Sequence, residues 1–193
     1  RLGLPGIGEN RPGASGNLAA GLVAHATDGH TIGVMINGNL TIARLLNPKL
    51  SFDPARDFAP LSLIATAPLV LVAAADASGA SPKAFLETAR QAGSRWNYGS
   101  PGVGTIAHIG MELIKARTGI AAVHVPYPGN PQVIGALLGG QIQLALLPPG
   151  LAMAQVKAGK LRAIAVTGAG RSTLAPEVPS LADAGVPGVL LDI

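Results

Sequence analysis

The sequence has 193 residues, 48% of them apolar and 12% charged, with a formal net charge of +4 and no cysteine. This composition excludes a disordered chain, a disulfide framework and a thiolate metal site, and the apolar stretches fall short of the ~20 residues of a transmembrane helix. The basic residues are scattered and aromatic residues make up only 3%, which argues against nucleic-acid binding, whereas a mildly positive field suits small anions.

Short apolar runs alternate with segments of helical character along the chain. The expected strands are residues 31–36, 61–65, 69–75, 121–125, 142–147 and 161–167. The expected helices are residues 18–26, 83–91, 105–118, 132–138 and 151–158. Ser81 and Pro82 are typical of the start of a helix before residues 83–91, and Gly119 is typical of a helix end after residues 105–118. Because the apolar runs do not alternate with polar residues, they are typical of strands buried on both faces of a parallel sheet. The sequence therefore predicts an α/β fold with mostly parallel sheets.

The chain offers two places at which it could cross between lobes. One is residues 66–68, between two apolar runs, and the other is residues 159–160, before the last expected strand. If both are crossings, residues 1–67 and 161–193 form a first lobe and residues 68–160 form a second lobe. A single sheet would give the same pattern, so both arrangements stay open at this point.

The most informative segment, residues 97–108, is a glycine-rich loop that follows a short expected strand at residues 95–98 and opens the helix that begins near Thr105. Its glycines allow sharp turns and the close approach of a ligand to the backbone. The first amides of a helix have no partner within it, so the loop predicts an anion site, with the hydroxyls of Ser100 and Thr105 as further donors. An ordinary tight turn is the alternative. No lysine follows the glycines and the dinucleotide fingerprint is incomplete, so we expect no cofactor.

Two other turns are candidate ligand-binding segments. Residues 9–17 contain Pro-Gly and Ser-Gly pairs before an alanine-rich helix, and a simple helix start is the favoured interpretation of this segment. Asn37 and Asn39 follow an expected strand, at the strand end where open α/β sheets bind ligands. An Asn-Gly turn without a ligand is the alternative there.

The residues do not indicate an enzyme or a metal site. A Ser100–His108 pair would suggest a hydrolase, but Ser100 lacks the G-x-S-x-G elbow and Pro101 has no N–H to offer an oxyanion hole. The acidic residues suggest no pair for acid–base catalysis, and the other three histidines lack the spacing of metal ligands. We therefore expect a binding protein without a metal, and a Ser/His hydrolase is the least favoured alternative.

Segments along the whole chain resemble the receptors of tripartite tricarboxylate transporters, also known as the Bordetella uptake gene family. The matching segments are residues 9–17, 28–31, 47–48, 52–54, 57–60, 97–108, 124–127, 137–141, 157–163, 166–168 and 179–188. Each segment is short, but they run in the order that the family has. Their joint order and spacing make the resemblance specific.

The resemblance implies a two-lobed periplasmic-binding fold of the Venus-flytrap, type II-like kind. Such a receptor is periplasmic, closes on a small carboxylate and delivers it to a membrane permease. Carried over to this sequence, the ligand-binding residues are Ser100, Gly102, Val103, Gly104, Thr105 and His108 in the second lobe and Asn37 and Asn39 in the first. A ligand-sensing receptor for a membrane-bound kinase would need the same pocket and is the alternative function.

Three departures from the family pattern change these expectations. The strand and Pro/Gly-rich loop that the family has before Glu9, and its elements after Ile193, are missing, so we expect a fragment with an incomplete first lobe. Its uncovered surface predicts association between copies. No secretory leader is visible at Arg1. The apolar residues 147–149 and Pro128 replace polar ones, which favours a monocarboxylate, an aromatic acid or a less polar dicarboxylate as ligand.

Overall fold

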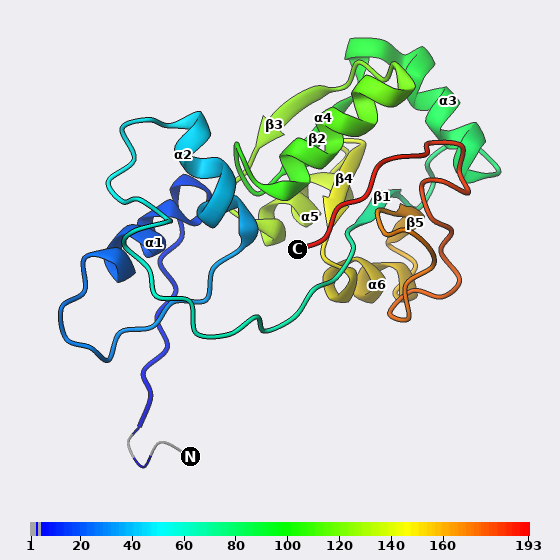
Figure 1. The fold of residues 1–193 in the computed structure, drawn as a ribbon. Coiled ribbons are helices and arrows are strands. Elements are labelled where there is room, and N and C mark those ends of the chain that lie inside the picture. The colour runs from blue at the N-terminus through cyan, green and yellow to red at the C-terminus, as the bar shows by residue number, and fades with distance from the viewer. Residues whose placement is uncertain (1–2, 4) are drawn as a thin grey trace.

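A five-stranded sheet with helices on both faces forms the main body of the protein (Figure 1). The computed structural model describes residue 3 and residues 5–193. The strands are β1 (Val70–Ala74), β2 (Asn97–Ser100), β3 (Val123–Pro126), β4 (Leu144–Leu147) and β5 (Leu161–Val166). The helices around the sheet are α3 (Pro82–Ala92), η3 (Gly93–Arg95), α4 (Ile106–Thr118), α5 (Asn130–Leu138) and α6 (Pro149–Lys157). The N-terminal part contributes η1 (Ala14–Gly16), α1 (Asn17–Ala24), η2 (Gly38–Ile42) and α2 (Ala43–Leu46).

The sheet is mixed, with the strand order β3-β2-β4-β1-β5. Strand β2 pairs in parallel with β3 and β4, whereas β1 pairs antiparallel with β4 and β5. Four strands therefore run in one direction and β1 runs against them. The predicted α/β class is confirmed. A buried apolar run carries no information on strand direction, so the reversal of β1 could not be recognised from its sequence.

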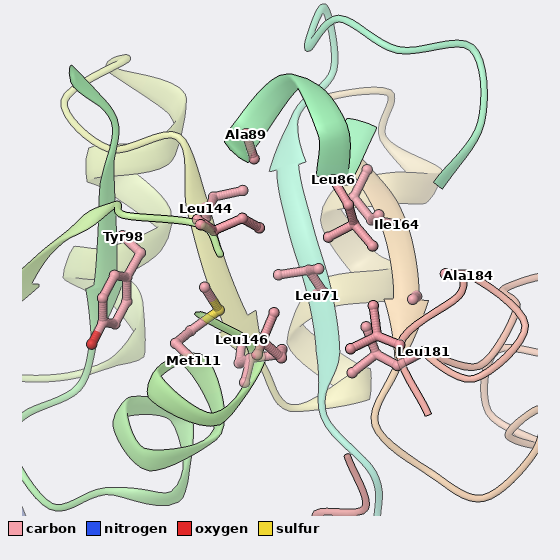
Figure 2. Packing of buried hydrophobic residues seen from close by; sticks show 14 of the residues in the cluster. Leu71, Leu86, Ala89, Tyr98, Met111, Leu144, Leu146, Ile164, Leu181 and Ala184 are labelled. Carbon is pink, nitrogen blue, oxygen red and sulfur yellow. The ribbon is translucent and has the colours of Figure 1, made fainter. Parts of the chain in front are cut away.

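The strands at the centre of the sheet are buried on both faces, as predicted. Val70 and Val72 of β1 pack against α5 and α6, whereas Leu71 packs on the other face. Figure 2 shows Leu71 beside Leu146 of β4, with Met111 of α4 over the same face. Burial of these side chains is the main favourable contribution to the stability of the sheet.

The helices begin and end at the sequence signals that predicted them. Ser81 caps α3, since its hydroxyl accepts a hydrogen bond from the N–H of Ala84 at 3.2 Å. Thr105 caps α4, which ends at Gly119 in the left-handed conformation. The five predicted helices are confirmed to within two residues at each end. Among the described residues, no helix has the length and apolar character needed to cross a membrane.

Two of the predicted strands are wrong. Residues 31–36 lie in the loop between α1 and η2, and residues 61–65 lie in the loop between α2 and β1, outside every helix and strand (Figure 1). Val34 is 83% exposed and Leu63 is 80% exposed. An apolar run forms a strand only where a neighbour supplies the hydrogen bonds of the ladder, and no described residue pairs with either segment. The predicted association between copies through such uncovered surface stays a prediction.

The turn at residues 159–160 does not lead away from the sheet. Gly159 turns the chain in the left-handed conformation and β5 then pairs with β1 over its whole length. The chain continues along the sheet until the backbones of Ala67 and Ile193 exchange two hydrogen bonds of 3.1 and 2.9 Å, just before β1 begins. Strand β5 therefore belongs to the same sheet as β1, while Ile193 lies beside Ala67. The division into residues 1–67 with 161–193 as one lobe and residues 68–160 as the other stays a prediction.

We expect Leu146→Ala to lower the free energy of unfolding by about 2–5 kcal/mol, because it removes a fully buried side chain and leaves a cavity. Leu63→Ala is the matched control, since it deletes the same atoms from an exposed side chain and should change the free energy of unfolding by no more than about 0.5 kcal/mol. Urea unfolding measures both variants. A loss of several kcal/mol with Leu63→Ala would contradict the exposed placement of residues 61–65.

Candidate functional site

The glycine-rich loop connects the end of β2 at Ser100 to the start of α4 at Ile106. Gly102 has a φ of 131° and Gly104 a φ of 80°, a region of backbone conformation that residues with side chains rarely adopt. The loop places the N-terminus of the 13-residue helix α4 at the carboxyl end of β2. The unpaired amides and the dipole of this helix end favour an anion.

Two buried hydroxyls fix the shape of the loop. Ser100 Oγ donates to the carbonyl of Gly102 at 3.0 Å and accepts from the N–H of the same residue at 3.2 Å. Thr105 Oγ1 donates to the same carbonyl at 2.8 Å. Ser100 is 0% exposed and Thr105 is 3% exposed. The hydroxyls that the sequence predicted as ligand donors therefore bind the backbone of the loop in this structure.

Two stacked histidines lie behind the loop. His108 Nδ1 accepts a hydrogen bond from the N–H of Gly104 at 3.2 Å. His124 Nε2 lies 2.7 Å from Ser100 Oγ, and the ring centroids of the two histidines are 4.2 Å apart. Ser100 thus contacts His124 and not His108, and the pair considered for a hydrolase is absent from the contacts of the described residues.

The surroundings of both histidines favour the neutral form. Burial lowers the pKa of His124 to about 4, and repulsion from the neighbouring His108 adds to this shift. Burial also lowers the pKa of His108. His124 could not be selected as a site residue from the sequence, because its contact with Ser100 depends on the register of β2 against β3, which places Tyr98 opposite His124.

A cavity of about 230 Å³ lies between the loop and the N-terminal segment. It is lined by residues of both parts of the chain, namely Ala14, Ser15, Asn17, Gly38, Asn39, Ala43, Leu46, Asn47, Val103, Gly104 and Thr105. A larger hollow of about 470 Å³ lies elsewhere, beside β5, and Arg162 and Glu177 are among its lining residues. It contains neither the glycine-rich loop nor the Asn-containing turn, so we assign the candidate site to the smaller cavity.

Ser15 reaches across this cavity from a strained backbone. Its hydroxyl donates to the carbonyl of Val103 at 2.8 Å. The four residues Gly13–Gly16 all have positive φ, including 58° at Ser15, which costs free energy in a residue with a side chain. The side-chain amide of Asn39 holds this segment by donating to the carbonyl of Ser15 and to Asn17 Oδ1, both at 2.9 Å. Ser15 was missed in the sequence because its neighbourhood was interpreted as a simple helix start.

Glycines allow the two walls of the cavity to approach each other. A Cβ on Gly102 would overlap the side chain of Ser15, and a Cβ on Gly38 would lie 3.1 Å from the carbonyl oxygen of Gly104. Each wall therefore has a glycine where the other comes closest. The glycines in the sequence predicted that another group lies close to the loop backbone, but the sequence did not identify Ser15 as that group.

The predicted ligand-binding residues take three different positions. Asn39, Val103, Gly104 and Thr105 line the cavity. Ser100, Gly102 and His108 are in the loop or behind it and contact its backbone. Asn37 lines no part of the cavity and instead donates to the carbonyl of Asp192 at 2.8 Å while its Oδ1 accepts the N–H of Gly38. No group of three His, Asp or Glu side chains among the described residues could hold a metal ion.

Residues 1–191 match the family described as tripartite tricarboxylate transporter family receptor. One relative is a UPF0065 protein in the tcbD-tcbE intergenic region of Pseudomonas sp. (strain P51), which is 34% identical over 189 residues. That alignment covers 97% of this chain and 56% of the relative. The chain therefore spans little more than half the length of this curated relative.

Two solved structures with named ligands have the same fold. MatC from Rhodopseudomonas palustris with bound malate superposes with a TM-score of 0.85 at 29% identity, over 93% of this chain and 62% of MatC. Rpa4515 from R. palustris with adipate gives a TM-score of 0.91 at 33% identity, over 95% of this chain and 62% of Rpa4515.

We expect Gly102→Ala to lower the melting temperature by several degrees, because the added Cβ meets Ser15 and forces alanine into a positive φ. Gly135→Ala is the matched control. Gly135 lies within α5 with open space around its Cβ position, so this change should raise stability by about 0.5–1 kcal/mol. Thermal unfolding measures both, and an unchanged melting temperature for Gly102→Ala would contradict the loop conformation.

Proposed function

Because the chain belongs to the tripartite tricarboxylate transporter receptor family, we propose that it is the ligand-binding part of a periplasmic receptor that captures a small carboxylate. The receptor would then deliver the carboxylate to the membrane permease of the transporter. The family supplies the class of partner and the location outside the cytoplasm. The chain's own residues supply the reasons for assigning the carboxylate to one cavity.

The observation that carries the proposal is the chemistry of the cavity between the loop and the N-terminal segment. Its lining includes Ser15, Asn17 and Asn39 as polar side chains and contains no acidic residue. The start of α4, at Thr105, also lies in the lining, and its amides and dipole favour negative charge. A carboxylate accepts hydrogen bonds only, so the amides at the start of α4 and the side-chain N–H groups of Asn17 and Asn47 are donors complementary to it.

A dicarboxylate is the ligand class that we favour. MatC was solved with malate and Rpa4515 with adipate, and both have the fold of this chain. The apolar sequence at residues 147–149 led us to expect a less polar ligand. Leu147 and Pro149 are buried in the core and line no part of the described cavity, so adipate-like and malate-like acids are both to be tested.

Capture would involve closure of the cavity walls on the ligand. Ser15 already reaches the carbonyl of Val103 across the cavity, and a carboxylate between the walls could accept the same hydroxyl proton. The paired backbones of Ala67 and Ile193 bring two segments of chain together at one side of the sheet, an arrangement suited to a hinge. A ligand favours the closed form only through contacts that the open form lacks, and a hydrogen bond from the Ser15 hydroxyl to the carboxylate would be one such contact.

A receptor fits the surroundings of Ser100 better than a hydrolase does. The hydroxyl is fully buried and its hydrogen bonds go to the loop backbone, so it is not available to attack a substrate. Pro101 supplies no N–H next to it. His124 Nδ1 has no carboxylate among its hydrogen-bond partners in the described residues, so no acidic group orients this imidazole. The family that the chain matches is likewise described as a receptor family.

We expect one or more small carboxylates to raise the melting temperature of the chain, in a panel of malate, adipate, a monocarboxylate, an aromatic acid and citrate, with neutral amides as negative controls.

Asn39→Ala should weaken affinity for the best ligand about two- to tenfold, because it frees the Ser15 segment. Lys83→Ala, which removes an exposed cation on α3 far from the cavity lining, should leave affinity unchanged. Equal losses with both variants would indicate non-specific attraction of anions and contradict the assigned site.

A further inference from the structure

A column of stacked side chains lies directly behind the ligand-facing loop. The His124 ring lies between the His108 ring, at a centroid distance of 4.2 Å, and the Tyr98 ring, at 4.8 Å. Lys115 Nζ lies 5.3 Å from the centroid of the Tyr98 ring. Tyr98 is on β2, His124 is on β3, and the other two residues are on α4, so the column joins the two elements that the loop connects to the neighbouring strand β3.

Glu112 anchors one end of this column. Its Oε1 accepts a hydrogen bond from the Tyr98 hydroxyl at 2.5 Å and another from Lys115 Nζ at 2.7 Å. Tyr98 is fully buried, so its ring cannot move without disturbing the core. With one face on Tyr98 and the other on His108, the imidazole of His124 is held in one orientation.

Counting protons assigns the direction of the contact between His124 and Ser100. Ser100 Oγ carries one proton and already accepts the N–H of Gly102. The carbonyl of Gly102 can only accept, so its 3.0 Å contact with Ser100 Oγ is a hydrogen bond only when Ser100 donates its proton there. The 2.7 Å contact is then satisfied when His124 Nε2–H donates to Ser100 Oγ. His108 takes the same tautomer, because its Nδ1 accepts from Gly104.

We propose that His124 is a positioning residue for ligand binding, which holds the Ser100 hydroxyl and through it the backbone of Gly102, so that the loop keeps the shape that faces the carboxylate. The inference rests on the proposed function of the loop. It concerns a side chain that lines no part of the cavity and acts on the ligand only through Ser100 and Gly102.

The charges around His124 agree with a neutral donor. Burial and the neighbouring His108 lower its pKa to about 4, the cation of Lys115 acts in the same direction, and Glu112 opposes the shift. The unfolded chain, with an ordinary histidine pKa of 6.5, therefore takes up a proton first as the pH falls from 6.5 to 4. Stability is lost in that window and is fully present above it.

The test compares two substitutions at position 124 and combines one of them with Ser100→Ala. His124→Gln keeps an N–H donor near the position of Nε2, whereas His124→Leu removes it and leaves Ser100 Oγ without this partner. We expect His124→Leu to weaken the affinity for the best carboxylate of the panel about tenfold and His124→Gln to weaken it less than threefold. Isothermal titration at pH 7.5 measures both.

The double variant decides whether His124 acts through Ser100. If it does, adding Ser100→Ala to His124→Leu should weaken binding no further than the more damaging single change does. Additive losses would overturn the inference, as would equal losses for His124→Gln and His124→Leu. A second measurement is the pH dependence of the melting temperature, which between pH 6.5 and 4 should fall less steeply in His124→Gln than in the unchanged chain.

A measurement without ligand separates this inference from the proposed function. In the ¹⁵N NMR spectrum, the imidazole of His124 should be in the Nε2–H form, and the amide signals of Gly102 and Gly104 should shift in His124→Leu but stay near their positions in His124→Gln. The Nδ1–H form, or unmoved amides in His124→Leu, would overturn the inference whether or not any carboxylate binds. A chain that meets both expectations and binds no carboxylate would contradict the proposed function only.

Discussion

The carbonyl of Gly102 accepts hydrogen bonds from two buried hydroxyls, those of Ser100 and Thr105, and the candidate site depends on this arrangement. It fixes a backbone with positive φ at Gly102 and Gly104, in a stretch where glycine is the residue that fits. Because Gly102 has no side chain, Ser15 can lie against it and reach Val103. The start of α4, the approach of the N-terminal segment and the cavity between them all follow from this one turn.

The two walls of the cavity achieve their shapes by different means. The loop is held from behind by the stacked column of Tyr98, His124 and His108, which belongs to the rigid sheet and α4. The opposite wall is a strained segment that Asn39 holds from one side. A site with one rigid wall and one strained wall suits a receptor, since the ligand can stabilise the strained wall when the cavity closes.

Local signals in the sequence were sufficient for much of the fold. Ser81, Thr105 and Gly119 marked helix ends through hydrogen bonds made within a few residues, and the glycine-rich segment at residues 97–108 predicted the turn that lines the candidate cavity. The resemblance to the transporter receptors, which the family match confirms, rested on many such short segments. The reversed β1 and the unpaired residues 31–36 and 61–65 were missed because strand direction and strand pairing depend on distant partners.

The candidate site was also difficult to predict, because its contacts depend on residues that are distant in the sequence. The residue types of Ser100 and Thr105 indicated hydrogen bonding, but not that the loop backbone would be the partner. His124 became relevant only through the register of β2 and β3, and Ser15 only through a positive φ that sequence does not predict for serine.

The measurement that most directly tests the assigned cavity is an NMR titration of the ¹⁵N-labelled chain with malate and with adipate. The amide signals of residues 102–107 and of Ser15 should shift in a saturable manner, because the ligand contacts the loop, the start of α4 and the opposite wall. Shifts confined to the other hollow, around Arg162 and Glu177, would contradict the assignment of carboxylate binding to the glycine-rich loop.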